Sequence, residues 1–125
     1  MDNATLGDIA WLDLTVENAG QIRDFYQQVI GWQVENVSMG EYNDYSMLNS
    51  GTQSAVSGIC HARGSNADLP PMWLPYFLVG DVEQAARTVQ SEGGTLVTEV
   101  KSMGKDKFVV IKDPAGAACA LYQQG

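Results

Sequence analysis

The chain repeats itself at a spacing of about 63 residues, and this repeat restricts the possible folds more than any other feature. A strand-like run ending at Val16 has a counterpart ending at Val79, which lies 63 residues later. Each run leads into a helical pattern that ends at glycine, at Gly31 and at Gly94, again 63 residues apart. Because a fixed period is typical of duplicated structural units, the sequence predicts two copies of one module.

Each copy is predicted to be a βαβββ module. The first helix is expected over Ala19–Ile30, where apolar residues recur at helical spacing. The second is expected over Val82–Glu92, with Asp81 as a side chain that can cap its free backbone N–H groups. Three strand-like runs follow each helix, at Trp32–Val37, Tyr45–Asn49 and Ala55–His61, and at Thr95–Lys101, Lys107–Lys112 and Ala117–Gln123.

The predicted fold class is therefore α+β. Residues 1–61 form the first module, residues 62–71 a polar linker that ends in two prolines, and residues 72–125 the second module. Together they make one domain of 125 residues. With 45% hydrophobic and 18% charged residues, the chain has enough apolar side chains to bury a core.

The charge balance excludes several classes of partner. The net charge of −8 argues against nucleic acid and against an anionic membrane surface, since both need clustered Lys and Arg. No stretch reads as a secretion signal or a membrane anchor. Cys60 and Cys119 fit neither a disulfide framework nor a metal motif. We therefore expect a cytoplasmic protein with reduced thiols.

The alternation within the run Trp11–Val16 assigns its two faces. Leu14 and Val16 belong to an apolar set that should pack on the first helix, whereas Asp13 belongs to a mixed set on the other face. The equivalent strands of the second module follow the same rule. Two half-sheets of this kind, curving together, would enclose a cleft lined by the mixed faces.

The sequence resembles the vicinal oxygen chelate superfamily, which includes glyoxalase I, the bleomycin-resistance proteins and the extradiol dioxygenases. The resemblance covers nearly the whole chain and implies paired βαβββ modules in a cupped, mostly antiparallel eight-stranded sheet with helices outside. It also implies a homodimer. The matching segments read WLDLTV (Trp11–Val16), FYQQVIGW (Phe25–Trp32), LPYFLVGDVEQA (Leu74–Ala85), EGGTLV (Glu92–Val97) and DPAGAACAL (Asp113–Leu121).

Metal-dependent members of that superfamily bind their ion with His, Glu or Gln on the innermost strands. The resemblance carries these positions over to Trp11, Leu74 and Ala120, with a fourth somewhere on the run Ala55–His61. Tryptophan, leucine and alanine side chains offer no group that coordinates Zn²⁺, Ni²⁺ or Fe²⁺. We therefore expect no metal and no other cofactor.

Two residues are candidates for acid–base chemistry. Asp13 should point into the cleft, where desolvation would raise the pKa of its carboxyl. The alternative is that it hydrogen-bonds Tyr76 or a backbone donor and only shapes the pocket. His61 is the sole histidine, and the ordinary pKa of an imidazole, about 6.5, suits proton transfer. It can equally be a strand-end residue partly in solvent.

An aromatic and thioether character marks the predicted cleft strands and suits a flat or apolar ligand. Trp11 could either stack on such a ligand or fill the space of the missing metal. The connector Ser38–Asp44 is expected to be a turn that can overhang the cleft. The candidate ligand-binding residues are Trp11, Asp13, Tyr45, Met47, Leu74, Tyr76, Phe108, Ala120 and Tyr122.

Three hypotheses for the function follow. The first is a metal-independent protein that binds a small apolar or aromatic metabolite or drug. The second is a metal-free isomerase or lyase-like enzyme that uses Asp13 or His61 as its base. The third is a structural or partner-binding domain whose cleft is filled by side chains such as Trp11.

Overall fold

The computed structural model describes residues 5–125, which fall into two compact units. One unit is continuous in sequence and spans Leu12–Trp73. The other combines the described residues up to Trp11 with Leu74–Gly125. The first strand, β1 (Ile9–Val16), therefore contributes its beginning to one unit and its remainder to the other. These units are defined by contacts within the folded chain and do not test where one copy of the repeat ends and the next begins. The module boundaries at residues 61 and 72 therefore stay a prediction.

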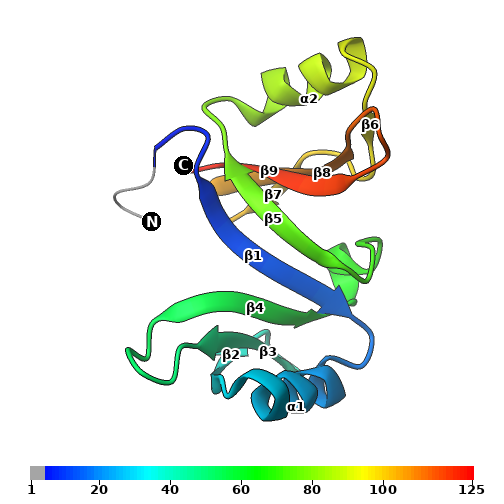
Figure 1. Ribbon diagram of the computed structural model, residues 1–125. Coiled ribbons are helices and arrows are strands. Elements are labelled where there is room, and N and C mark those ends of the chain that lie inside the picture. Colours follow the sequence, from blue (N-terminus) through cyan, green and yellow to red (C-terminus); the bar gives the residue numbers. More distant parts are fainter. Residues whose placement is uncertain (1–4) are drawn as a thin grey trace. The chain divides into compact units, whose positions relative to one another are not determined.

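The continuous unit contains one helix over a half-sheet in the order β2-β3-β4-β1 (Figure 1). β1 and β4 are parallel, and the other neighbours are antiparallel. After β1 its elements are α1 (Ala19–Ile30), β2 (Gln33–Ser38), β3 (Asn43–Leu48), β4 (Ala55–His61) and the short 3₁₀ helix η1 (Gly64–Asn66).

The other unit repeats this plan in the strand order β5-β9-β8-β6, with β7 also paired to β8. β5 and β9 are parallel, as β1 and β4 are. The mixed sheet with two helices confirms the predicted α+β class. The elements are β5 (Trp73–Leu78), α2 (Val82–Ser91), β6 (Thr95–Leu96), β7 (Lys101–Met103), β8 (Asp106–Lys112) and β9 (Ala118–Gln123).

The run predicted as one strand over Thr95–Lys101 is interrupted, so the described residues form nine strands instead of eight. The interruption lies at Thr98. Its hydroxyl donates to the carbonyl of Glu99 at 2.8 Å and accepts from the backbone N–H of Val110 at 3.1 Å. Because this side chain takes the place of a backbone ladder partner, the chain bends away from β8 and rejoins it at β7.

The predicted C-cap of the first helix and the predicted N-cap of the second are confirmed. Gly31 adopts the left-handed conformation, with φ 86°, and its N–H donates to the carbonyl of Gln27 at 2.9 Å. The carboxylate of Asp81 accepts from the N–H of Gln84 at 3.1 Å at the start of α2. These caps fix where each helix turns back toward the sheet.

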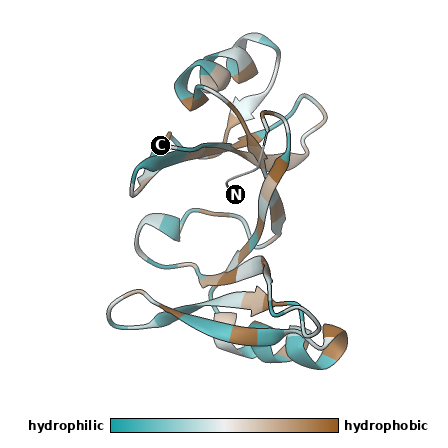
Figure 2. Ribbon diagram, turned by 90° about the vertical axis from the view of Figure 1, so that its left-hand side faces the viewer, coloured by the Kyte–Doolittle hydropathy of each residue, from teal (hydrophilic) through white to brown (hydrophobic). Residues whose placement is uncertain are grey.

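Each helix packs on the strand face that the alternation predicted. Leu14 and Val16 lie beneath α1, and Val79 and Leu121 lie beneath α2. The apolar stripe of α1 is only partly used, however, because Phe25, Val29 and Ile30 are 54%, 63% and 51% exposed. Figure 2 shows hydrophobic and hydrophilic residues mixed along the helices and strands.

A cluster of aromatic rings explains why α1 leaves these residues outside. Tyr26 packs edge-on against Trp73, with ring centroids 5.3 Å apart, and lies 6.0 Å from Trp32. The indole N–H of Trp73 donates to the Tyr26 hydroxyl at 3.0 Å. These large rings fill the space beneath the helix, so its flank faces outward.

Among residues 5–125, no helix is both long and apolar enough to cross a lipid bilayer.

Candidate functional site

The strand positions that correspond to metal ligands do not fit a metal ion. Leu74 and Ala120 are buried hydrocarbon side chains, 2% and 0% exposed, and Trp11 offers only an indole. In the part of the chain that the structure describes, no group of three or more His, Cys, Asp or Glu residues is placed to hold a metal. The donor set at these positions therefore lacks the nitrogen, oxygen or thiolate ligands that Zn²⁺, Ni²⁺ or Fe²⁺ require.

The two predicted acid–base residues lie on opposite faces of the same half-sheet. Leu14 pairs with Ile59 and Val16 pairs with His61, which gives His61 the strand parity of the residues beneath α1. Asp13 has the other parity and pairs with Gly58. The two side chains thus do not converge directly.

A third residue, Asp44, links the two faces. Its carboxylate oxygen Oδ1 accepts from the backbone N–H of His61 at 2.8 Å and lies 3.2 Å from the Nδ1 atom of the same residue. Asp44 is only 5% exposed. This contact fixes the imidazole orientation and favours the tautomer that carries its proton on Nδ1, leaving Nε2 as the acceptor.

The sequence placed Asp44 in a connector, and the structure corrects this. Asp44 is the second residue of β3, and its side chain is buried. The connector is consequently shorter than the predicted Ser38–Asp44. The role of Asp44 depends on the pairing of β3 with β4, which shifts register at Met47 and Leu48. A register shift of this kind has no signature in the sequence.

Cys60 sits between the carboxylates of Asp13 and Asp44. Its Sγ lies 3.5 Å from Oδ2 and 3.7 Å from Oδ1 of Asp13. Burial, followed by the negative charges of the two aspartates, raises the pKa of the Cys60 thiol far above its ordinary value. The thiol therefore keeps its proton, donates a hydrogen bond to Asp13 and is a poor nucleophile.

Aromatic and cationic side chains surround His61. The rings of Tyr42 and Tyr45 lie 5.3 Å and 5.9 Å from the imidazole. The guanidinium of Arg63 lies over the Tyr42 ring at 4.1 Å, and that of Arg23 over the Tyr45 ring at 4.5 Å. His61 keeps 19% of its side chain exposed. The arrangement restricts the imidazole without removing it from solvent.

The other candidate ligand-binding residues are mostly buried. Met47, predicted to line a cleft, instead packs beneath α1 with Leu14 and Ile59, because it shares their strand parity. In the other unit, Tyr76 contacts the rings of Phe108 and Tyr122 at 5.8 Å and 6.4 Å. The fully buried candidates are Met47, Leu74, Tyr76, Phe108, Ala120 and Tyr122, all no more than 6% exposed.

The strand pairings show that one position in the module carries different chemistry in the two copies. Leu14 and Tyr45 pair with Ile59 in the continuous unit, as Phe77 and Val109 pair with Leu121 in the other. This register matches equivalent positions in the two units. Where the discontinuous unit has three aromatic rings, the continuous unit has two carboxylates and a thiol. The correspondences are Asp13 with Tyr76, Asp44 with Phe108, and Cys60 with Tyr122.

This difference identifies the polar cluster as the candidate site. In one copy the position is filled by packed aromatic rings, which need no further partner. In the other copy it holds two carboxylates close to a thiol and an imidazole. Charged groups are rarely kept in such half-buried places for packing alone. We define the polar cluster as Asp13, Asp44, Cys60 and His61.

Comparisons with known proteins agree with this architecture. The sequence model of the Glyoxalase/Bleomycin resistance protein/Dioxygenase superfamily matches residues 8–121. The anthracycline biosynthesis protein DnrV of Streptomyces peucetius is 28% identical over 131 residues, covering 95% of this chain and 48% of that protein. CFP32 of Mycobacterium tuberculosis, which is named as a glyoxylase, is 28% identical over 115 residues, covering 90% of this chain and 44% of that protein. The chain thus spans about half the length of these curated relatives.

Solved structures show the same fold at low sequence identity. A methylmalonyl-CoA epimerase in complex with methylmalonyl-CoA and NH4+ matches with a TM-score of 0.58 and 14% identity, over 97% of this chain and 96% of that one. The methylmalonyl-CoA epimerase of Mycobacterium tuberculosis matches with a TM-score of 0.54 and 15% identity, over 98% and 92%. At such identities the likeness concerns the fold alone.

Proposed function

Because the chain belongs to the Glyoxalase/Bleomycin resistance protein/Dioxygenase superfamily, we propose that it binds a small apolar or aromatic metabolite or drug without a metal ion. One observation carries the proposal. The positions that correspond to metal ligands hold Trp11, Leu74 and Ala120, whose side chains cannot coordinate an ion. A family fold without its metal donors retains the capacity to bind an organic ligand.

The polar cluster supplies the directed contacts that such a ligand needs. Binding sites are mostly apolar, with a few polar groups that fix the ligand's orientation. Asp13 is only half-buried, so it can contact a ligand on its face of the half-sheet. Tyr45 is also half-buried, but it lies on the opposite face, with Met47 and α1. The name of DnrV points to anthracyclines, which are flat aromatic molecules, as a reasonable first ligand class.

The test is a titration of the purified chain with an anthracycline, in which the quenching of tryptophan fluorescence measures binding. The proposal expects saturable binding that is unchanged by a chelator and by added Zn²⁺ or Ni²⁺. Asp13→Leu should weaken the binding, whereas Asp24→Asn, an exposed carboxylate on α1, should not. Binding that appears only with added metal would overturn the proposal.

A second candidate function is metal-free acid–base catalysis, and the contact between Asp44 and His61 favours it. With its Nδ1 proton held by the carboxylate at 3.2 Å, the imidazole presents Nε2 as a general base. Such a base can remove a proton from a carbon next to a carbonyl group, as isomerases, epimerases and lyases require. Asp13, on the other face of the half-sheet, is the alternative base.

Deuterium exchange tests this candidate without waiting for a product. Methylmalonyl-CoA is incubated with the chain in D₂O, and loss of the proton next to its carbonyl is followed by NMR. Catalysis at His61 predicts exchange that is abolished in His61→Gln and reduced in Asp44→Asn. Exchange at the same rate in wild type and His61→Gln would exclude His61 as the base for this substrate.

We also propose a homodimer, which the resemblance implies, and a cytoplasmic location, which the two free cysteines favour.

A further inference from the structure

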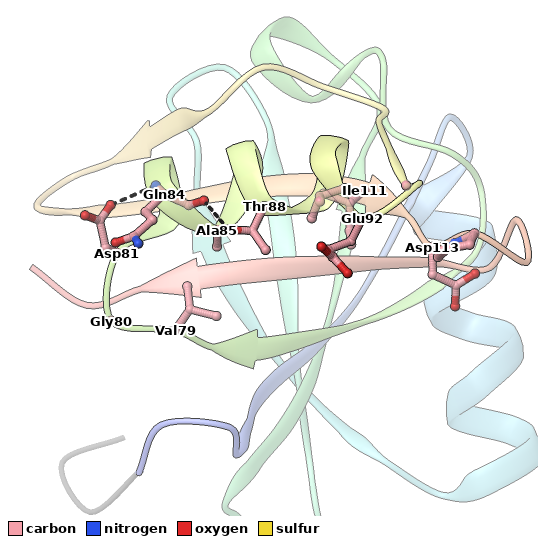
Figure 3. Close-up of a pocket in the computed structure, with 12 residues that line it drawn as sticks. Val79, Gly80, Asp81, Gln84, Ala85, Thr88, Glu92, Ile111 and Asp113 are labelled. Carbon is pink, nitrogen blue, oxygen red and sulfur yellow. Dashed lines mark hydrogen bonds between the residues drawn. The ribbon is translucent and has the colours of Figure 1, made fainter.

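A groove lies on the helix side of the discontinuous unit, between α2 and the ends of the neighbouring strands (Figure 3). Its volume is about 490 Å³, which is in the range of sites for small organic molecules. Its apolar floor is made by Val79, Ala85, Val89, Ile111 and Pro114.

Small side chains on α2 leave this groove open. At the spacing of the repeat, Ala85 and Val89 correspond to Ile22 and Tyr26 of α1. In the continuous unit those two larger residues pack against the core beneath the helix. Val89 also packs on the core of its unit, but the shorter side chains on α2 leave a groove beside the helix, which Ile111 lines from β8.

Three carboxylates stand around the apolar floor. Figure 3 shows Asp81 at one end of the groove, Asp113 at the other, and Glu92 near the end of α2. Asp81 caps the helix, and Asp113 accepts backbone N–H groups of the following turn, so both are held in place. No Lys or Arg belongs to the described lining. The groove thus combines an apolar surface with charged groups that are all negative.

We propose that this groove binds a small organic cation, namely a protonated amine attached to an apolar or aromatic body. The body would lie on the floor and the ammonium group near Glu92 and Asp113. An anionic ligand is disfavoured by the carboxylates, and the chain's net charge of −8 adds to this preference. The site is independent of the proposed function, since the polar cluster belongs to the other unit.

A matched pair of probes tests the charge preference. Naphthylmethylamine is protonated at pH 7, and naphthylmethanol has the same ring without the charge. Each is titrated into the ¹⁵N-labelled full chain, and NMR shifts locate and quantify binding. The proposal expects the amine to bind more tightly, with shifts concentrated around Val79, Thr88 and Gly94. Equal affinities for the two probes would overturn it.

Two variants separate charge from shape. Glu92→Gln should weaken amine binding about two- to fivefold, the value expected for one partly exposed charge pair, and leave the alcohol unaffected. Its control is Glu83→Gln, which removes the same charge from α2 outside the groove, where Glu83 pairs with Lys107 at 3.4 Å. Comparable weakening by both variants would show a general field effect and contradict the site.

Ala85→Ile tests the groove itself by restoring the residue found at the equivalent position of α1. The added carbons should occupy the floor and abolish binding of both probes. Because the groove is open, the variant should keep the wild-type unfolding transition, which circular dichroism verifies. Unchanged binding in a folded Ala85→Ile variant would also overturn the proposal.

Discussion

Ser57 is a buried hydroxyl with no hydrogen-bond partner. Its side chain on β4 is 0% exposed, and its Oγ atom has no partner among the described residues. An unpaired buried polar group costs about 1–3 kcal/mol. Ser57→Ala removes the group with little loss of volume, so we expect the free energy of unfolding to stay the same or rise by about 1 kcal/mol. Urea denaturation measures this change.

The control for Ser57 is a buried hydroxyl that is fully used. Thr98 is 5% exposed, and its Oγ1 accepts the N–H of Val110. Thr98→Val keeps the shape but leaves that N–H unpaired, which should lower the free energy of unfolding by about 1–3 kcal/mol. A destabilised Ser57→Ala, or an unaffected Thr98→Val, would show that these hydroxyls are bonded differently in solution.

Tyr122 gives the unfolding equilibrium a dependence on alkaline pH. Burial, then the hydrogen bond to Asp106, raises the pKa of Tyr122 from its ordinary 10.0 to about 12. The unfolded chain therefore loses this proton at lower pH than the folded chain. The corresponding stabilisation is complete below pH 10 and is lost as the pH rises toward 12.

We therefore expect Tyr122→Phe to have a flatter stability profile than wild type between pH 10 and about 12. Chemical denaturation at several pH values measures the two profiles. Ultraviolet titration of wild type minus variant should show a single tyrosine with a midpoint near pH 12. A difference titration centred at pH 10 would contradict the buried, hydrogen-bonded hydroxyl.

The sequence singled out two of the four members of the polar cluster, Asp13 and His61, and missed Asp44 and Cys60. Asp13 and His61 stand out because one is a charge in an apolar strand and the other is the single histidine. Asp44 and Cys60 acquire their roles from the pairing of β3, β4 and β1, which joins segments far apart in the chain. The same pairing puts Asp13 and His61 on different faces. Cross-strand register of this kind is set by the folded core.

At the scale of elements, alanine substitutions at two glycines are expected to change the free energy of unfolding in opposite directions. A Cβ atom at Gly94 would lie 2.7 Å from the carbonyl oxygen of Lys112 and 2.8 Å from Val89 Cγ1, so the end of α2 is pressed against β8. Gly94→Ala should therefore lower the free energy of unfolding by about 1–3 kcal/mol, the cost of overpacking. At Gly20 in α1, the nearest atom would be the Tyr45 hydroxyl oxygen at 3.7 Å.

Gly20→Ala should consequently raise the free energy of unfolding by about 0.5–1 kcal/mol, because alanine restricts the unfolded chain more than glycine. Thermal and urea unfolding of both variants compare the two sites. Similar effects at Gly20 and Gly94 would contradict the close approach of α2 to β8.

Helices and turns were predictable because their signals are local. The caps at Gly31 and Asp81 follow from single residues. The split of the strand at Thr98 and the exposed flank of α1 were not predicted. Both depend on what lies opposite: the backbone of Val110 in one case, and the rings around Tyr26 in the other. Tertiary contacts of this type override local propensity.

At the scale of the whole molecule, the repeat predicted two copies of one module with one helix each, and the resemblance implied how their strands form a sheet. The parallel pairs β1–β4 and β5–β9 were not predicted. Duplication of one module accounts for the equivalence of these two pairs. It does not fix the chemistry placed on each copy, since carboxylates in one unit replace the aromatic rings of the other. Function therefore has to be argued from the site and not from the fold.

The oligomeric state is the prediction that belongs to this scale. The resemblance implies a homodimer, and the exposed apolar residues Phe25, Val29 and Ile30 are candidates for contact with another molecule. Sedimentation equilibrium over a range of concentrations should give twice the monomer mass. A monomer mass throughout that range would contradict the prediction.

The division of β1 between the two units has a consequence for synthesis on the ribosome. The unit Leu12–Trp73 is complete once its last residue has emerged, and it can fold while translation continues. The other unit needs residues from both sides of the continuous unit, because the N–H of Gly7 donates to the carbonyl of Leu78 and the N–H of Leu78 to that of Asp8. Its opening segment must therefore wait, without these backbone partners, until Leu78 has emerged, which is after the continuous unit is complete. Assembly is thus ordered in time, with the half that carries the polar cluster first.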